Sequence, residues 1–158
     1  MNFSEYIDNL CRQHKTIKHS DEECHYTDIS EDAQNGYAHM HMHYPCIVLE
    51  EESVTFTAGQ KDLEHDHYIL LFLDHVRDTG DADEIRSVFN DMKTVATDFL
   101  RRFARDKRKI VKPMAQFSIN DVEMERVSLR AAALYGYAMT VNIDTTFVDL
   151  DCNQAFEE

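Results

Sequence analysis

The chain is organised around the segment Asp81-Ala-Asp-Glu-Ile-Arg-Ser-Val-Phe-Asn-Asp-Met-Lys-Thr-Val-Ala-Thr-Asp-Phe-Leu-Arg-Arg-Phe-Ala-Arg-Asp-Lys107. Its apolar side chains recur every three or four residues, at Ala82, Ile85, Val88, Phe89, Met92, Val95, Ala96, Phe99, Leu100 and Phe103. This spacing places them on one face of an α-helix. Asp81 and Glu84 have the form of a capping box at its start. The sequence therefore predicts one helix about 40 Å long, and we expect the other elements to pack on its apolar face.

Length and composition indicate one folded domain. The chain has 158 residues, of which 43% are hydrophobic, and this is enough for a packed core. No apolar run reaches the roughly 18–20 residues of a membrane span, and the first residues lack the pattern of a signal peptide. The four cysteines are scattered, which favours free thiols in a reducing cytosol. We expect a single α+β domain over residues 1–158, with an acidic tail at about 149–158 that is frayed or docks on a partner.

Shorter patterns predict the remaining elements. Residues 3–15 have the spacing of a short helix. Strands are expected at residues 25–29, 46–49, 54–57, 68–73, 122–131 and 135–143. A turn at 50–53 and a loop at 58–66 would separate three of them, and residues 30–44 fit either a strand or a helix. The predicted fold class is α+β: a mostly antiparallel sheet packed against one long helix, with a short N-terminal helix.

Three of these strands carry more detailed predictions. Residues 68–73 are apolar on both faces, as in a central strand that is covered on two sides. The apolar alternation in 122–131 changes phase near Arg126, which indicates a bulge. In 135–143, Gly136 and Ala138 place only small side chains on one face of the strand, so that a helix could pack close to that face.

Basic residues gather at the end of the predicted long helix. The net charge is −14, yet seven of the sixteen Lys and Arg residues fall within residues 101–112, where Asp106 is the one acid. The rest of the chain then carries about −20. A basic helix end suits the helix dipole as a solvated surface, and it also suits head-to-tail contacts between copies. The candidate interface residues are Arg101, Arg102, Arg105, Lys107, Arg108 and Lys109.

A run of alternating histidines is the one candidate metal site. In a strand, His39, His41 and His43 would share one face, with His65 and His67 downstream. Imidazole is a good ligand for zinc, copper and nickel. A polar exposed face explains the same pattern, and we expect no metal and no cofactor, with His39, His41 and His43 as the alternative.

Catalytic motifs are missing from the sequence. There is no Gly-x-Ser-x-Gly elbow, and the four glycines are not clustered into a phosphate-binding loop. The acids around Asp74-His75, from Asp78 to Asp83, are explained by turn formation and helix capping. We expect no enzyme activity. The negative net charge also disfavours nucleic acid as a partner, and we expect neither sequence-specific nucleic-acid binding nor a membrane partner.

The order of elements resembles a known family. The expected order is a short helix, the strand Tyr44-Pro45-Cys46-Ile47-Val48-Leu49, a central strand at 68–73, a long helix and a closing strand through Leu134-Tyr135-Gly136-Tyr137. This order resembles that of the tail terminator and tail-completion (neck) proteins of bacteriophages. The resemblance implies a structural protein of the virion, assembled in the host cytoplasm. It implies a homo-oligomeric ring, often a hexamer, that contacts tail-tube or neck proteins.

Two other classes stay open on the sequence alone. One is a metal-binding or sensor module built on the His39–His43 segment. The other is a small cytosolic adaptor that uses its acidic surface to hold a basic protein, and it would bind one partner without forming a closed ring.

Overall fold

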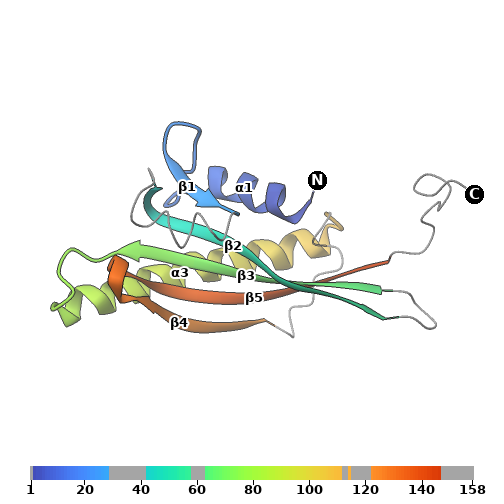
Figure 1. Cartoon of the computed structure of the whole chain (residues 1–158). Helices are drawn as coiled ribbons and strands as arrows, with labels where there is room; N and C mark the ends of the chain where they lie inside the picture. The colour runs from blue at the N-terminus through green and yellow to red at the C-terminus, as the bar shows by residue number, and fades with distance from the viewer. Residues whose placement is uncertain (1, 29–41, 58–62, 112–113, 115–121, 147–158) are drawn as a thin grey trace, which may run out of the picture.

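The computed structural model describes residues 2–28, 42–57, 63–111, 114 and 122–146 (Figure 1). The elements in chain order are α1 (Phe3–Gln13), β1 (Cys24–Thr27), β2 (Met42–Thr57), β3 (Leu63–His75), α3 (Ala82–Arg108), β4 (Glu123–Leu129), the short 3-10 helix η3 (Arg130–Ala132) and β5 (Leu134–Thr146). The predicted segment 30–44 and the acidic tail lie largely or wholly outside the described residues, and so do His39, His41 and Cys152. Cys11, Cys24 and Cys46 are free thiols.

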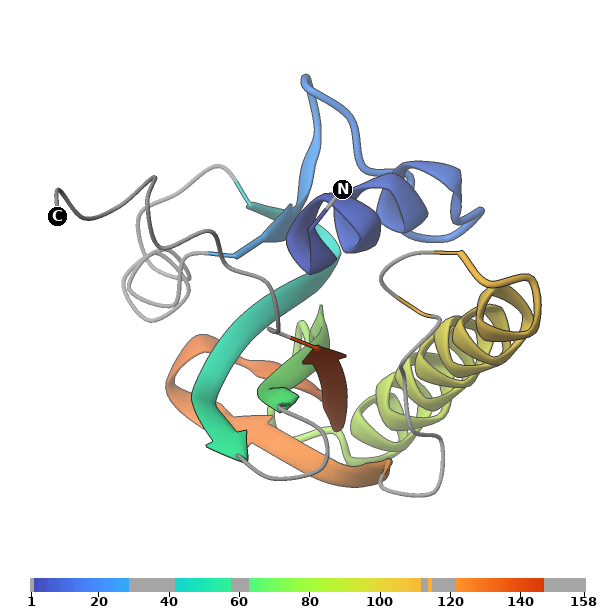
Figure 2. The ribbon, with the colours of Figure 1, turned by 90° about the vertical axis from the view of Figure 1, so that its right-hand side faces the viewer.

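The described strands form one sheet in the order β1-β2-β3-β5-β4. β1 pairs with β2 in parallel, and the three other pairings are antiparallel. Both helices contribute side chains to the main core on one face of this sheet, and Figure 2 shows α3 lying along the curved sheet with α1 above it. The α+β prediction is therefore confirmed, as are the short N-terminal helix, the long helix and the central position of the 68–73 strand.

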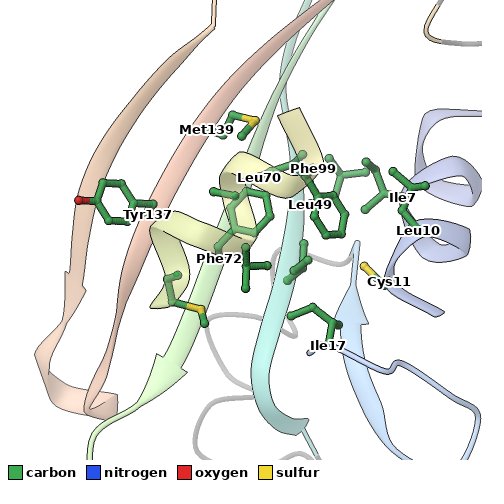
Figure 3. Close-up of a cluster of buried hydrophobic side chains, with 14 of the residues drawn as sticks. Ile7, Leu10, Cys11, Ile17, Leu49, Leu70, Phe72, Phe99, Tyr137 and Met139 are labelled. Carbon is green, nitrogen blue, oxygen red and sulfur yellow. The ribbon is translucent and has the colours of Figure 1, made fainter. Parts of the chain in front are cut away.

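The apolar stripe of α3 holds the two layers together. Its buried side chains are Val88, Phe89, Met92, Val95, Ala96, Phe99 and Phe103. The Phe99 ring meets the Phe72 ring of β3 edge-on, with 5.4 Å between centroids, and Figure 3 shows both within the cluster. Edge-to-face aromatic pairs add to the stabilisation that burial provides. The stripe has the spacing that the sequence predicted.

The start of α3 differs from the predicted capping box. The Asp81 carboxylate does cap the helix, since it accepts from the backbone N–H groups of Asp83 and Glu84. The Glu84 carboxylate, however, accepts from the backbone N–H groups of Arg77 and Asp78. Glu84 therefore fixes the loop that enters the helix, because those two donors lie within its reach and need a partner.

β2 and β3 are longer than predicted. β2 runs unbroken through the expected turn at 50–53, with a pairing irregularity between Glu51 and Ser53, and β3 begins at Leu63 inside the expected loop. Both predictions are wrong for one physical reason. Glu51 and Ser53 are exposed, and the far ends of both strands project beyond the helices (Figure 1). Backbone pairing therefore holds these residues in the sheet without an apolar pattern.

The predicted bulge in β4 is also wrong. Residues Glu123 to Leu129 pair with Thr140 to Leu134 in a single register. Met124 packs against the main core, whereas Val127 and Leu129 pack against a second cluster on the opposite face. The phase change in the sequence marks a switch in which face of the strand is covered. Ala131, predicted to continue this strand, belongs to η3.

Gly136 is required by a neighbouring strand and not by a helix. A Cβ at this position would lie 1.7 Å from the Phe72 carbonyl oxygen of β3. α3 packs instead on the opposite face of β5, where Phe89 meets the rings of Tyr135 and Tyr137. The prediction that Gly136 admits a helix is therefore wrong, although a close backbone approach is the correct reason for the glycine.

Replacing Phe99 with Ala tests the role of the apolar stripe. Phe99 is 2% exposed, so its truncation leaves a cavity, and we expect a loss of about 3–5 kcal/mol in the free energy of unfolding. Urea unfolding measures this loss. Asn90→Ala, on the exposed side of the same helix, is the control and should change stability by less than about 0.5 kcal/mol. Equal losses of stability from Phe99→Ala and Asn90→Ala would mean that the buried face of α3 is assigned wrongly.

Candidate functional site

The predicted interface residues all lie at the C-terminal end of α3. Arg101, Arg105, Arg108 and Lys109 are exposed, whereas Arg102 and Lys107 are partly buried. The start of the same helix is acidic, with exposed carboxylates at Asp78, Asp81 and Asp83. These two groups of opposite charge are separated by the length of α3, about 40 Å for its 27 residues. The described part of the chain is therefore polarised along its longest helix.

α3 ends in a Schellman motif that has isoleucine where glycine is usual. The N–H of Ile110 donates to the Lys107 carbonyl at 3.0 Å, and the N–H of Val111 donates to the Asp106 carbonyl at 2.9 Å. Ile110 adopts a φ of 58°, a left-handed conformation that costs a β-branched residue about 1–2 kcal/mol. Its side chain is 78% exposed. A strained backbone here presents an apolar side chain to solvent among basic residues.

One buried carboxylate organises the end of α3. Asp106 is 4% exposed and receives three hydrogen bonds: from the Tyr6 hydroxyl of α1 at 2.8 Å, from Arg102 Nε at 2.8 Å and from Arg105 Nε at 3.3 Å. Burial by itself would raise the pKa of this carboxyl, but the hydrogen bonds from Arg102, Tyr6 and Arg105 outweigh burial and lower it. Asp106 therefore stays ionised and links α1 to α3.

The sequence interpretation missed this role of Asp106. It counted Asp106 as the single acid in a basic run. The signal was the spacing, because Asp106 follows Phe99 and Phe103 at seven and three residues and so continues the apolar stripe. An acid on that stripe, with Arg102 four residues before it, is the pattern of a buried ion pair. Arg102 and Arg105 are thus engaged with Asp106, and Arg101 lies 3.8 Å from Asp98, so three of the six predicted interface residues already have an intramolecular partner.

A groove runs between α1 and α3 beside this network. Two cavities of about 420 and 480 Å³ both contact Leu10, Gln13 and Arg102. The first extends past Lys15 and the second past Lys109. The centre of the groove is therefore lined by an apolar side chain, an amide and the Arg102 guanidinium, with a lysine at each end.

The histidine prediction is only partly covered by the described residues. His43 lies exposed in β2, and its ring is 5.5 Å from that of His25. His39 and His41 lie outside the described residues. Within the ranges that the structure describes, no group of three His, Cys, Asp or Glu side chains is placed to hold a metal ion. The metal alternative therefore gains no support from His43.

His65 and His67 form two cross-strand rows on the projecting ends of β2, β3 and β5. His65 lies 3.1 Å from Thr57 Oγ1 through Nε2 and 2.5 Å from Asp144 Oδ1 through Nδ1. His67 makes the same contacts with Thr55 at 3.2 Å and Asn142 at 2.7 Å. Both ring nitrogens of each histidine thus face a strand neighbour, so neither is turned toward a shared metal.

The Thr57–His65–Asp144 row has the order of a nucleophile, a base and an orienting acid. The second row repeats its geometry with an amide in place of the acid, which identifies a ladder of paired side chains that follows the strand register. The threonines are exposed on the strand surface. These side-chain contacts add to the backbone pairing of the projecting strands.

Comparisons of the chain with protein-family models, with curated proteins and with solved structures found no match. No helix among the described residues has the length and apolar character needed to cross a membrane.

Asp106→Asn tests the buried carboxylate through its pH dependence. The amide keeps the shape but loses the charge, so we expect a loss of about 1–2 kcal/mol in the free energy of unfolding at pH 7. Because the folded-state pKa of Asp106 is lowered, its contribution is complete above the unfolded value of about 3.9 and is lost as pH falls through the folded pKa. The difference in the free energy of unfolding between the unaltered protein and Asp106→Asn should therefore shrink below about pH 4.

Urea unfolding at pH 7, 5 and 3 measures this gap. Asp91→Asn, an exposed change on the same helix, is the control, and we expect it to have little effect at pH 7. A gap for Asp106→Asn that stays constant down to pH 3 would contradict an ionised, hydrogen-bonded carboxylate.

Ile110→Gly tests the strain at the end of α3. Glycine adopts the left-handed conformation without steric cost, and little buried area is lost because Ile110 is exposed. We expect the free energy of unfolding of the monomer to rise by about 0.5–1 kcal/mol. Thermal unfolding at low protein concentration measures the change. A destabilised variant would show that the isoleucine side chain packs within its own chain.

Proposed function

We propose that this protein is a structural assembly subunit that associates with copies of itself through the basic end of α3. In the class that its element order resembles, it would be a ring subunit of a phage or phage-like tail, of the terminator or neck type. It would contact tail-tube or neck proteins in the virion after assembly in the host cytoplasm. Its action would be contact between proteins and not catalysis.

The observation that carries this proposal is the exposed, left-handed Ile110. Backbone strain of this kind is concentrated at sites where the strained residue has a use. A glycine would end α3 at lower cost, so the isoleucine side chain is kept for a contact that the described residues of the single chain do not make. An apolar residue ringed by charged residues is the usual composition of a contact centre and its rim.

Charge placement supports contacts between copies. The acidic start of α3 and its basic end complement each other when one subunit follows another head to tail. Such heterologous contacts close into rings when the rotation between neighbours permits. The resemblance in element order supports the same conclusion, because an α+β body with one long helix on a sheet is the architecture that it implies.

Assembly is measured by light scattering on purified protein and by negative-stain images. We expect closed rings, or association that weakens as salt rises from about 0.05 to about 0.5 M, since screening acts on exposed charges. A chain that stays monomeric at high concentration and does not bind tail-tube or neck proteins would contradict the proposal.

Arg108→Glu tests the basic end as the contact surface. Arg108 is exposed and lies outside both the Asp106 network and the groove. We expect the association constant to fall roughly tenfold or more, because like charges meet across the interface, with an unchanged far-UV CD spectrum. Lys93→Glu makes the same charge change on the exposed side of the same helix and should leave association unaltered. Equal effects of the two variants would reject the basic end of α3 as an interface.

A further inference from the structure

The groove between α1 and α3 has the chemistry of a peptide-binding site. Leu10 and Phe99 supply buried apolar surface at its base, and Gln13 supplies an exposed amide. Its acids are Asp98, which lies near His14 and Arg101, and Asp106, which is held by its own partners. Its bases are Lys15, Arg102, Arg105 and Lys109. In a chain of net charge −14, this groove is a locally basic channel.

The two arginines are preorganised for carboxylates. Arg102 and Arg105 each contact Asp106 through Nε, which fixes the position of the guanidinium group. A guanidinium carries four further N–H donors on its terminal nitrogens. Arginines fixed in this way lose little side-chain entropy when they bind another carboxylate. The expected ligand is therefore an acidic peptide that also has apolar side chains.

The chain itself contains such a peptide. Residues 147–158 read Phe-Val-Asp-Leu-Asp-Cys-Asn-Gln-Ala-Phe-Glu-Glu, with four acids, no base and three large apolar residues. This segment lies outside the described residues and follows Thr146. Thr146 pairs with Leu63 on the projecting end of the β2–β3–β5 strands, beyond the ends of both helices (Figure 1). The last described residue before the segment is therefore at the projecting end of the sheet.

We propose that residues 147–158 of one copy bind the groove between α1 and α3 of a second copy. The acidic side chains would pair with Lys15, Arg102, Arg105 and Lys109, and the apolar ones would cover Leu10, Phe99 and the exposed Ile110. This inference rests on the proposed self-assembly and names the segment that links successive subunits. Each subunit donates one segment and accepts one, as a heterologous contact requires.

Two variants separate the two halves of this contact. The first lacks residues 147–158 and keeps the groove. The second keeps the segment and carries Lys15→Glu with Lys109→Glu, two exposed positions at the ends of the groove. Each alone is expected to stay monomeric at concentrations at which the unaltered chain assembles. Lys18→Glu with Lys93→Glu, two exposed lysines outside the groove, is the matched control and should assemble normally.

Mixing the two variants gives the decisive result, read by sedimentation velocity. We expect a one-to-one pair and nothing larger, because one intact groove and one intact segment remain. A mixture that contains only monomers would overturn the inference. That result is expected if residues 147–158 bind the groove of their own chain. Assembly that persists without residues 147–158 would overturn this inference and leave the proposed function standing, whereas an unaltered chain that never assembles would contradict both.

A binding assay tests the same contact without relying on assembly. A fluorescent peptide of residues 147–158 should bind the deletion variant, with an affinity that falls as salt rises. Replacing its acids with the corresponding amides should weaken binding at least tenfold, and so should the Lys15→Glu, Lys109→Glu change in the protein. Equal binding of the acidic and amide peptides would overturn the role assigned to charge.

Discussion

The buried carboxylate of Asp106 is the constraint on which this end of the molecule depends. Its side chain holds Tyr6 of α1 and two arginines of α3, while its backbone carbonyl receives the N–H of Val111 and closes the helix. One residue therefore sets both the distance between the helices and the place where α3 ends. The groove, the position of Arg102 and the exposure of Ile110 all follow from it.

In the proposed assembly, the stability of the single chain and the association of subunits are opposed at this helix end. A left-handed isoleucine and a cluster of like charges both raise the free energy of the isolated chain. The apolar stripe of α3 on the sheet offsets that cost, because it buries large aromatic side chains against β3 and β5. The strain is local and lies next to the Asp106 hydrogen-bond network, which would hold the proposed contact surface in one shape before a partner binds. Binding then loses less conformational entropy.

Much of the fold could be predicted from the sequence, because a helix or strand with one buried face has apolar residues at a regular spacing. The α3 stripe and the alternation of Tyr135, Tyr137 and Met139 are signals of this kind. Residues 50–53 of β2 and 63–66 of β3 carry no such period, since backbone pairing between the two strands holds them. The phase change in β4 was visible but ambiguous, because a bulge and a change of covered face produce the same pattern.

The site was predictable in part, and for a similar reason. Local charge density located the basic end of α3, but composition does not distinguish a buried acid from an exposed one. Tyr6 and Asp106 are 100 positions apart in the chain, so their contact depends on how α1 packs against α3. The left-handed φ of Ile110 is equally a product of the three-dimensional helix end. Sequence showed which residues were basic, and the structure shows which of them are already engaged.

If subunits associate through the basic end of α3, as proposed, Ile110 becomes covered. Hydroxyl-radical footprinting, with mass-spectrometric readout at dilute and concentrated conditions, tests it most directly. We predict that oxidation of Ile110 falls several-fold in the assembled protein relative to the monomer, because a side chain that is 78% exposed in the single chain would be covered by the neighbouring subunit. Oxidation of Ile110 that is the same in both states would contradict the account.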